Sequence, residues 1–344
     1  MPHPDALPAL PALPALLGPD AAPVRRALTD EEGISLPAFV DHHVHLHLID
    51  GERLPLGGIA AVVDLGGDPA VLAARPAGAL PHVTYAGAFL TTLGGYPAGR
   101  EWAPPAIVRQ ITDPSPQVGR PGGAATAVDE QRLAGASVIK IVLHHERPLP
   151  DDAMTTIVET AHAAGLVVVA HVEGDGMTRR ALDAGVDALA HTPFSERLDD
   201  DLIARAAAAQ VWISTLDIHR DDADAAGLAR ENLRAFRAAG GRVVYGTDLG
   251  NGELPLGVNP RELRALISAG CDGPALVAAL TDPWPGTASL PEVRTFLRGR
   301  PPGGADDLDA LADWLASASV VPTEDLIPAV DDEADGADRK DDDD

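Results

Sequence analysis

Short apolar runs rich in β-branched residues alternate with alanine-rich segments of helical period along most of the chain. Eight runs predict buried strands, at residues 38–45, 59–64, 82–88, 137–143, 166–172, 186–191, 210–215 and 242–248. Helical patterns fill most of the intervals, at residues 124–134, 151–164, 175–184, 198–208, 222–239, 259–269 and 273–281. Because this alternation extends over about 250 residues, it predicts an α/β fold of the (β/α)8 (TIM) barrel type over residues 30–281.

The segments outside this alternation differ from it in composition. Residues 89–123, rich in Gly and Pro, are too long for an ordinary connection and predict a functional loop near the barrel mouth. Residues 1–29 begin with a Pro/Ala-rich repeat, which predicts an extended or poorly ordered N-terminal segment. Residues 282–328 predict a C-terminal helical extension, and residues 329–344 an acidic disordered tail. The tail ends in a run close to a common epitope tag, so whether it is native stays open.

Charge and cysteine content narrow the partners. The 344-residue chain carries a formal net charge of −26, and both nucleic acid and anionic membranes attract positive patches, so we expect neither as a partner. Cys271 is the single cysteine, which rules out an intrachain disulfide and favours a reducing interior. No run of about 18 apolar residues and no signal-peptide pattern occurs. We therefore expect a soluble cytoplasmic protein that acts on a small molecule and could form a homo-oligomer.

The first predicted strand carries two histidines in a pattern suited to a metal ion. Side chains alternate faces along a strand, so Asp41, His43 and His45 share one face. Two imidazoles on one rigid face can close on a single ion of the zinc type. A lone His-x-His pair is more often a pair of ordinary histidines, so the assignment depends on residues elsewhere in the chain.

Four more candidate ligands end later strands of the predicted barrel. They are Lys140 on the fourth strand, His171 on the fifth, His191 on the sixth and Asp248 on the eighth. Function in such barrels sits at the carboxyl ends of the strands. Imidazole and oxygen donors that converge from several strands suit a metal site, and six at one end are hard to produce by chance.

Lys140 stands out because the chain has only two lysines, and the other, Lys340, lies in the acidic tail. An unpaired ammonium inside a strand is costly to bury, so the amine should be neutral or chemically altered. A neutral amine can add carbon dioxide to give a carbamate, an oxygen ligand able to bridge two metals, whereas the pKa of arginine is too high for that role. The alternative is a lysine paired with a nearby acid.

The chain resembles the amidohydrolase superfamily, and most of all its prolidase-like and imidazolonepropionase-like branch. The matching phrases span about residues 30–281 and are Leu-Pro-Ala-Phe-Val-Asp-His-His-Val-His (36–45), Val-Val-Asp-Leu-Gly-Gly (62–67), Gly-Ala-Ser-Val-Ile-Lys-Ile (135–141), Ala-His-Val-Glu-Gly (170–174), Ala-Gly-Val-Asp-Ala-Leu-Ala-His (184–191), Tyr-Gly-Thr-Asp-Leu-Gly (245–250) and Glu-Leu-Arg-Ala-Leu-Ile-Ser-Ala-Gly (262–270).

The resemblance implies two divalent metal ions, zinc first, with manganese or cobalt as alternatives. His43 and His45 would hold the first ion with Asp248, and Lys140, as its carbamate, would bridge to a second ion held by His171 and His191. In the family a bridging hydroxide attacks the substrate carbonyl while the eighth-strand aspartate, here Asp248, moves the proton. Two divalent ions would lower the pKa of bound water and polarise the carbonyl.

The sequence departs from the family pattern in ways that affect the ends and the substrate pocket. Family members usually carry a small β-sandwich built from both chain ends, and here we expect it to be missing or vestigial. Residues 92–96 and 255–257 lack histidines that relatives often have, which leaves the substrate open. Further candidates for substrate contact are His144, and Tyr96 with Arg147 for a carboxylate. Ordinary loop or surface roles are the alternative for each.

The sequence thus predicts a binuclear metal-dependent hydrolase that cleaves an amide or peptide C–N bond in a dipeptide or an N-acyl amino acid. One alternative is a mononuclear enzyme of the same fold that opens a cyclic amide or deaminates a ring. Another is an ester, lactone or phosphotriester hydrolase, because bridging-carbamate sites serve those substrates as well. A non-catalytic relic barrel is disfavoured, since a decayed site would have lost ligands.

Overall fold

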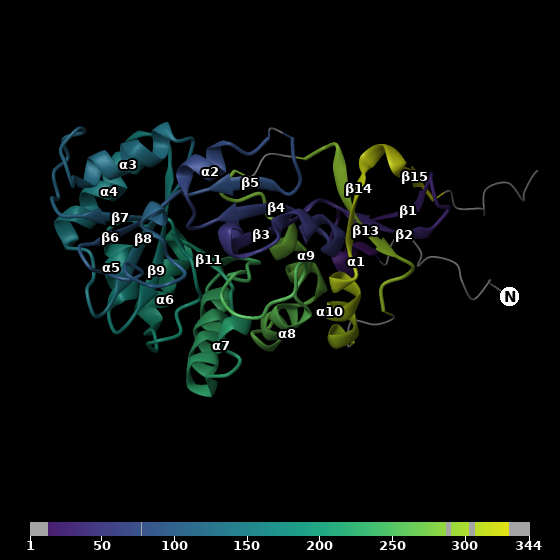
Figure 1. The fold of residues 1–344 in the computed structure, drawn as a ribbon. Coiled ribbons are helices and arrows are strands. Elements are labelled where there is room, and N and C mark those ends of the chain that lie inside the picture. Colours follow the sequence, from purple (N-terminus) through teal and green to yellow (C-terminus); the bar gives the residue numbers. More distant parts are fainter. Residues whose placement is uncertain (1–12, 77, 287–289, 303–306, 330–344) are drawn as a thin grey trace, which may run out of the picture.

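The computed structural model describes residues 13–76, 78–286, 290–302 and 307–329. Its α/β fold contains two parallel sheets, flanked by helices, and one antiparallel sheet (Figure 1). The larger parallel sheet has seven strands in the order β12-β11-β10-β9-β8-β6-β7. Their bounds are β6 Phe89–Thr92, β7 Val108–Ile111, β8 Val138–His144, β9 Val167–Glu173, β10 Ala188–Leu189, β11 Val211–Ile213 and β12 Arg242–Val244.

The second parallel sheet has three strands, β3 (Phe39–Val44), β4 (Ile59–Asp64) and β5 (His82–Tyr85). Backbone hydrogen bonds join the two sheets at both ends: the N–H of Leu249 donates to the carbonyl of His43 at 3.2 Å, and the N–H of Ser137 donates to that of Tyr85 at 3.2 Å. All eight predicted strand positions are confirmed as strands, although several are shorter than expected. Closure of the two sheets into one eight-stranded barrel stays a prediction.

The predicted helices are confirmed within one or two residues. They are α3 Ala124–Leu133, α4 Asp151–Ala163, α5 Met177–Asp183, α6 Asp200–Ala209, α7 Ala223–Ala238, α8 Pro260–Ser268 and α9 Gly273–Thr281, with the short α2 Pro69–Ala73 and the 3-10 helices Leu46–Leu48, Gly51–Gly57, Pro105–Ile107, Asp217–His219 and Thr323–Asp325. Polar caps explain several starts: the side chains of Asp199, Asn259 and Asp272 each accept a hydrogen bond from a backbone N–H in the first turn of α6, α8 and α9.

We expected residues 89–123 to form a loop, but the segment contains two strands. It contains β6, which pairs in parallel with β8, and β7, which extends the sheet beyond β6. Both strands are only four residues long, and Gly and Pro separate them, so the segment has the composition of a loop. The residues between β6 and β7 still lie at the mouth of the cavity described below.

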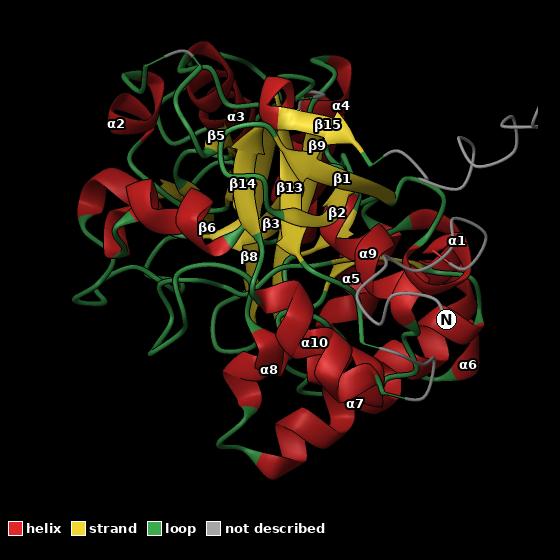
Figure 2. Cartoon of the chain, turned by 90° about the vertical axis from the view of Figure 1, so that its right-hand side faces the viewer, coloured by secondary structure: helices red, strands yellow, loops and turns green. Residues whose placement is uncertain are grey.

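We expected the small β-sandwich to be missing or vestigial, but both chain ends contribute strands to a substantial sheet. Five antiparallel strands in the order β14-β13-β2-β1-β15 form a sheet at one end of the molecule (Figure 2). Their bounds are β1 Ala22–Arg26, β2 Glu32–Leu36, β13 Val293–Arg298, β14 Ser319–Pro322 and β15 Leu326–Pro328. Residues 282–328 are therefore not a helical extension, because α10 (Leu308–Ala316) is their one α-helix within the described ranges.

The N-terminal segment is also more ordered than its proline content suggests. Helix α1 (Leu13–Leu17) packs against α9 and buries the side chains of Leu13 and Leu17 completely or nearly so. Strand β1 then pairs with β2 and β15, so residues 13–26 are not a poorly ordered tail. Residues 1–12 and the acidic tail from residue 330 lie outside the described residues.

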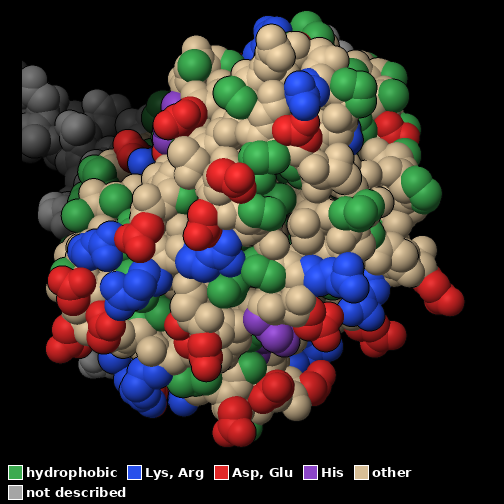
Figure 3. All heavy atoms as spheres, turned by 90° about the vertical axis from the view of Figure 1, so that its left-hand side faces the viewer, with side chains coloured by type: hydrophobic (Ala, Val, Ile, Leu, Met, Phe, Trp, Pro, Cys, Tyr) green, Lys and Arg blue, Asp and Glu red, His purple; other side chains and the backbone are tan. Residues whose placement is uncertain are grey.

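The core is built mainly from Ala, Val, Leu and Ile, as the low aromatic content requires. Within the described residues, no helix combines the length and apolarity that a bilayer crossing needs. One face of the molecule carries acidic and basic side chains side by side, with apolar side chains scattered among them (Figure 3). The net negative charge therefore does not gather as a single patch on that face.

Candidate metal centre

The structure brings the six predicted ligands to the same cavity. His43 lies in β3 and His45 directly follows it; Lys140 lies in β8 and His171 in β9. His191 and Asp248 follow β10 and β12 by two and four residues. All six side chains are buried, and all line one cavity of about 370 Å³. Parallel strands whose carboxyl ends meet explain why residues 200 positions apart converge here.

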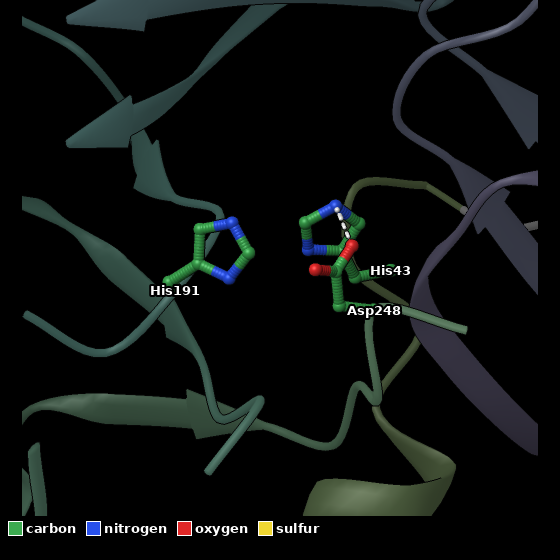
Figure 4. Close-up of side chains that lie close together, drawn as sticks. All are labelled: His43, His191 and Asp248. Carbon is green, nitrogen blue, oxygen red and sulfur yellow. Dashed lines mark ion pairs between the residues drawn. The ribbon is translucent and has the colours of Figure 1, made fainter. Parts of the chain in front are cut away.

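The carboxylate of Asp248 contacts both His43 in β3 and His45 just after it. Its Oδ1 atom lies 3.1 Å from Nε2 of His43 and 3.1 Å from Nε2 of His45. His191 faces His43 from across the site, with 4.8 Å between ring centroids (Figure 4). One ligand atom from each of His43, His191 and Asp248 lies within 4.8 Å of the other two, a spacing that suits a single shared cation.

Hydrogen bonds to the far nitrogens orient these imidazoles. His43 Nδ1 lies 2.8 Å from the Ala190 carbonyl, and His45 Nδ1 lies 3.2 Å from the Gly66 carbonyl. Since a carbonyl only accepts, Nδ1 carries a proton in both rings, and Nε2, which faces Asp248, is the nitrogen available to a metal ion. His191 Nδ1 lies 2.9 Å from the Thr215 hydroxyl. Such outer contacts are what metal-binding histidines use to fix their tautomer.

Lys140 is 1% exposed, and its Nζ has no hydrogen-bond partner among the described residues. Burial lowers the pKa of Lys140 to about 7, against the opposing effect of the Asp248 and Asp64 carboxylates. The amine is therefore substantially neutral near pH 7, the form that reacts with carbon dioxide. An ion pair with a nearby acid, the alternative for this lysine, does not occur in the described structure within 4.0 Å.

The histidine ligands are held in the form that binds cations. Burial lowers the pKa of His43 and His191 well below 6.5, and it also lowers the pKa of His171. These rings are neutral at pH 7 as a result, and a neutral imidazole is the ligand form. Nε2 of His43 and of His171 are buried without a hydrogen bond of acceptable geometry among the described residues.

A second buried carboxylate fixes the turn that carries Asp248. Asp41 accepts hydrogen bonds from the N–H and the hydroxyl of Thr247, at 3.0 and 2.6 Å, and from the N–H of His43 at 3.1 Å. Asp248 adopts φ 56°, in the left-handed region that is costly for a non-glycine residue. Gly246 permits close packing here, because a Cβ atom at that position would lie 2.3 Å from Ile213 Cγ2.

The donor set fits divalent cations. Neutral imidazoles, a carboxylate and an uncharged amine meet in one buried site, where several polar atoms lack partners. Buried polar atoms without hydrogen bonds are costly in a folded protein, and a bound cation would remove that cost. We therefore regard the residues present as compatible with the metals predicted from the sequence.

The three substrate-contact candidates lie in different places. Tyr96 lines the cavity, with its ring stacked on His144 at 5.5 Å between centroids. His144 is buried behind Tyr96, and its Nε2 lies 3.4 Å from Glu173 Oε1. Arg147 is exposed beside Gly94 and does not line the cavity. The structure thus gives Tyr96 access to a bound ligand and places Arg147 at the outer rim.

His144, His145 and Glu173 form a second group whose ligand atoms lie within 4.8 Å of one another. Nδ1 of His144 accepts a hydrogen bond from the N–H of Glu146 at 3.3 Å. The proton of the neutral ring is then on Nε2, directed to the Glu173 carboxylate. His144 thus has a contact at each ring nitrogen, and we do not assign this cluster a cation.

Several lining residues were not predicted from the sequence. They are Leu48, Phe89, Trp102, Val142, Glu173, Phe194, Ile218, His219, Gly250, Asn251 and Gly252. Phe194 and His219 follow β10 and β11 within six residues, so their position after a strand is a signal that could have identified them. Trp102 lies between β6 and β7, in the segment that we treated as an undivided loop.

No family model matches the chain, and no curated protein matches it in sequence. Solved structures match over most of its length. A putative prolidase from Bifidobacterium longum is 24% identical, with a TM-score of 0.62 over 81% of this chain and 77% of that one. A Xaa-Pro dipeptidase with methionine bound in its active site is 18% identical, with a TM-score of 0.61 over 86% and 87%. An amidohydrolase is 19% identical, with a TM-score of 0.63 over 86% of both chains.

Because these structures are less than 25% identical to the chain in sequence, the similarity establishes the fold alone. The chain has the fold of prolidases and amidohydrolases, and the resemblance predicted from the sequence motifs is confirmed at that level.

Proposed function

We propose that this chain is a metal-dependent hydrolase that cleaves the amide C–N bond of a small molecule. The observation that carries the proposal is the convergence of His43, His45, His171, His191 and Asp248 with a buried, partnerless lysine amine. The shared fold with a putative prolidase and a dipeptidase supports a carbon–nitrogen substrate. We further propose a closed (β/α)8 barrel, two ions, zinc first, and a carbamate on Lys140 Nζ.

The carbamate requires a deprotonated amine. Lys140 Nζ would attack carbon dioxide, an N–C bond would form, and one proton would leave for solvent, so that a neutral amine becomes an anionic oxygen ligand. Burial supports this step because it destabilises the ammonium. The anionic product would in turn need cations beside it, and His171 and His191 are placed to hold one.

Bound divalent ions supply two effects, a lowered pKa for water and a polarised substrate carbonyl. The chain supplies the movement of protons. Asp248 would accept a proton from the water as its oxygen adds to the carbonyl carbon, and would deliver that proton to the nitrogen as the C–N bond breaks. Asp41 and Thr247 keep the Asp248 turn in place during both transfers. The products are a carboxylic acid and an amine, so the step is balanced.

Asp248→Asn tests this assignment. The variant keeps the shape of the side chain and one oxygen ligand but cannot accept the proton, so turnover should fall roughly 10²–10⁴-fold. Elemental analysis should find about two divalent ions per chain in both proteins. A single ion at saturating metal in the parent would favour the mononuclear alternative. Parental turnover by Asp248→Asn with both ions bound would show that another residue moves the proton.

A further inference from the structure

Aromatic side chains are concentrated at the cavity. The chain has only twelve (five Phe, four Trp and three Tyr), and four of them, Phe89, Tyr96, Trp102 and Phe194, line this one site. Tyr96, Trp102 and Phe194 are only partly buried, although most other aromatic residues are packed in the core or the terminal sheet. Rings held in contact with solvent at a cavity mouth are typical of a surface that binds an apolar ligand.

Three of these rings form a continuous wall. Trp102 lies 6.0 Å from Phe89 and 6.0 Å from Tyr96 between ring centroids. Phe89 lies 5.5 Å from His45, and Tyr96 lies 5.4 Å from His171. The wall therefore reaches from one predicted ligand to another, directly beside the position that the reacting carbonyl would occupy.

Phe194 and His219 form a second pair of rings in the lining. Their rings lie 4.2 Å apart, and Phe194 also lies 6.3 Å from His191. Leu48, Val142 and Ile218 add apolar side chains to the same lining. A cavity of about 370 Å³ with this lining has room for a ring or a branched alkyl group beside the amide.

The charged side chains of the cavity lining bear on whether a substrate carboxylate could bind there. The described lining contains one lysine, Lys140, which lies among the predicted ligands, and no arginine, while Glu173 and Asp248 are acidic. The Arg100 guanidinium lies 5.6 Å from the Tyr96 ring centroid but is outside the lining, as is Arg147. A carboxylate on the apolar part of a substrate would thus meet no guanidinium in the cavity, and Glu173 would repel it.

We propose that the substrate is an uncharged amide bearing an aryl or bulky alkyl group, which is bound between the Phe89–Tyr96–Trp102 wall and Phe194. This inference rests on the proposed function, since it names the substrate class for the same site. It departs from the substrate class predicted from the sequence, because dipeptides and N-acyl amino acids carry a free carboxylate.

Binding to the metal-loaded protein tests the apolar subsite without any turnover. Hydroxamates chelate metals, so calorimetry should show phenylacetohydroxamate binding about tenfold to hundredfold more tightly than acetohydroxamate. Trp102→Ala and the milder Phe194→Leu should each remove much of this preference and leave acetohydroxamate affinity near the parental value. Leu133→Ala, on the exposed surface of α3, is the matched control and should keep the full preference.

Hydrolysis tests the charge requirement. N-phenylacetylglycinamide should have a higher kcat/KM than N-phenylacetylglycine, which differs by its free carboxylate, and a higher one than N-acetylglycinamide. A metal-loaded protein that binds both hydroxamates equally would overturn the apolar subsite, and preference for the free acid would overturn the neutral substrate. A protein that retains no metal and binds neither hydroxamate would instead overturn the proposed function on which this inference rests.

Discussion

Lys140 shows how one buried side chain can determine the chemistry of a site. The chain otherwise uses arginine for its positive charges, and a guanidinium keeps its proton in any protein environment. Burial favours the uncharged form of a lysine amine, and here it lowers the pKa of Lys140 to about 7. The proposed carbamate would account for the choice of lysine over arginine, because only a neutral amine can form it.

Lys140→Arg should therefore fail although it preserves the formal charge. A guanidinium cannot form the carbamate, so we expect the variant to lose one of two metal ions and most turnover. Lys140→Ala should do the same, and a short carboxylic acid should partly restore the site by supplying the missing oxygens. Metal content and turnover of both variants are the measurements. Wild-type turnover in Lys140→Arg would exclude the carbamate.

Glu262 is a buried carboxylate away from the metal centre. Its two oxygens accept hydrogen bonds from the N–H groups of Leu216 and Asp217, at 3.0 and 2.7 Å, and so hold the turn that carries His219. Burial raises the pKa of Glu262 from 4.5 to about 7, although these hydrogen bonds oppose the shift. Folding must therefore accommodate either a proton or an unfavourable buried charge.

The sign of the pH effect follows from that raised pKa. Between pH 4.5 and 7 the folded state binds more protons at Glu262 than the unfolded state does, so this residue makes stability fall as pH rises. The full loss is roughly 3 kcal/mol above pH 7. Denaturant unfolding of Glu262→Gln should lack this contribution, whereas Glu159→Gln on the exposed side of α4 should follow the parent. Identical pH profiles for all three proteins would contradict the assignment.

At the scale of elements, most strands of the parallel sheets could be predicted, whereas β6, β7 and the strands of the terminal sheet could not. β8 and β9 are buried on both faces and read as continuous apolar runs, a local signal. β1 contains Pro23 and two arginines, so its own sequence does not favour a strand. It forms a strand because β2 and β15 pair with it. β15 is both short and distant in sequence from β1.

The residues of the candidate site also fall into a group that could be predicted from the sequence and a group that could not. The ligands lie on or just after strands, where spacing and strand parity predict their direction. Trp102 and His219 lie in irregular segments whose path depends on packing, for example on the Glu262 hydrogen bonds. Sequence therefore predicted six side chains that meet in one cavity and missed most of the other residues that line it.

The contribution of helix α1 and strand β1 to stability can be measured by deleting them. Removing residues 1–24 would delete two buried leucines, Leu13 and Leu17, each worth about 1.5–3 kcal/mol, and part of β1. We expect a drop in Tm of several degrees or failure to fold. Removing residues 331–344 is the comparison and, on the composition of that tail, should leave Tm unchanged. Equal tolerance of both deletions, measured by thermal unfolding, would show that α1 and β1 contribute little.

At the scale of the whole molecule, the two parallel sheets and the terminal sheet share one core. Helix α9 contacts both α1 and β3, and β13 contacts β4 as well as β2. The terminal sheet is therefore attached to the strands that carry the first histidine pair. Helices α3 to α6 lie toward the opposite end of the molecule from the terminal sheet (Figure 1).

The pairing of β1 with β15 has a consequence for synthesis on the ribosome. Their partners, such as Val24 and Pro328, are about 300 residues apart in a chain that emerges from its N-terminus. Until the last strand is translated, one edge of β1 presents unpaired backbone N–H and C=O groups, an edge open to other chains. That edge therefore stays uncovered while the residues between β1 and β15 are made, and a chaperone that shields strand edges would act during that interval.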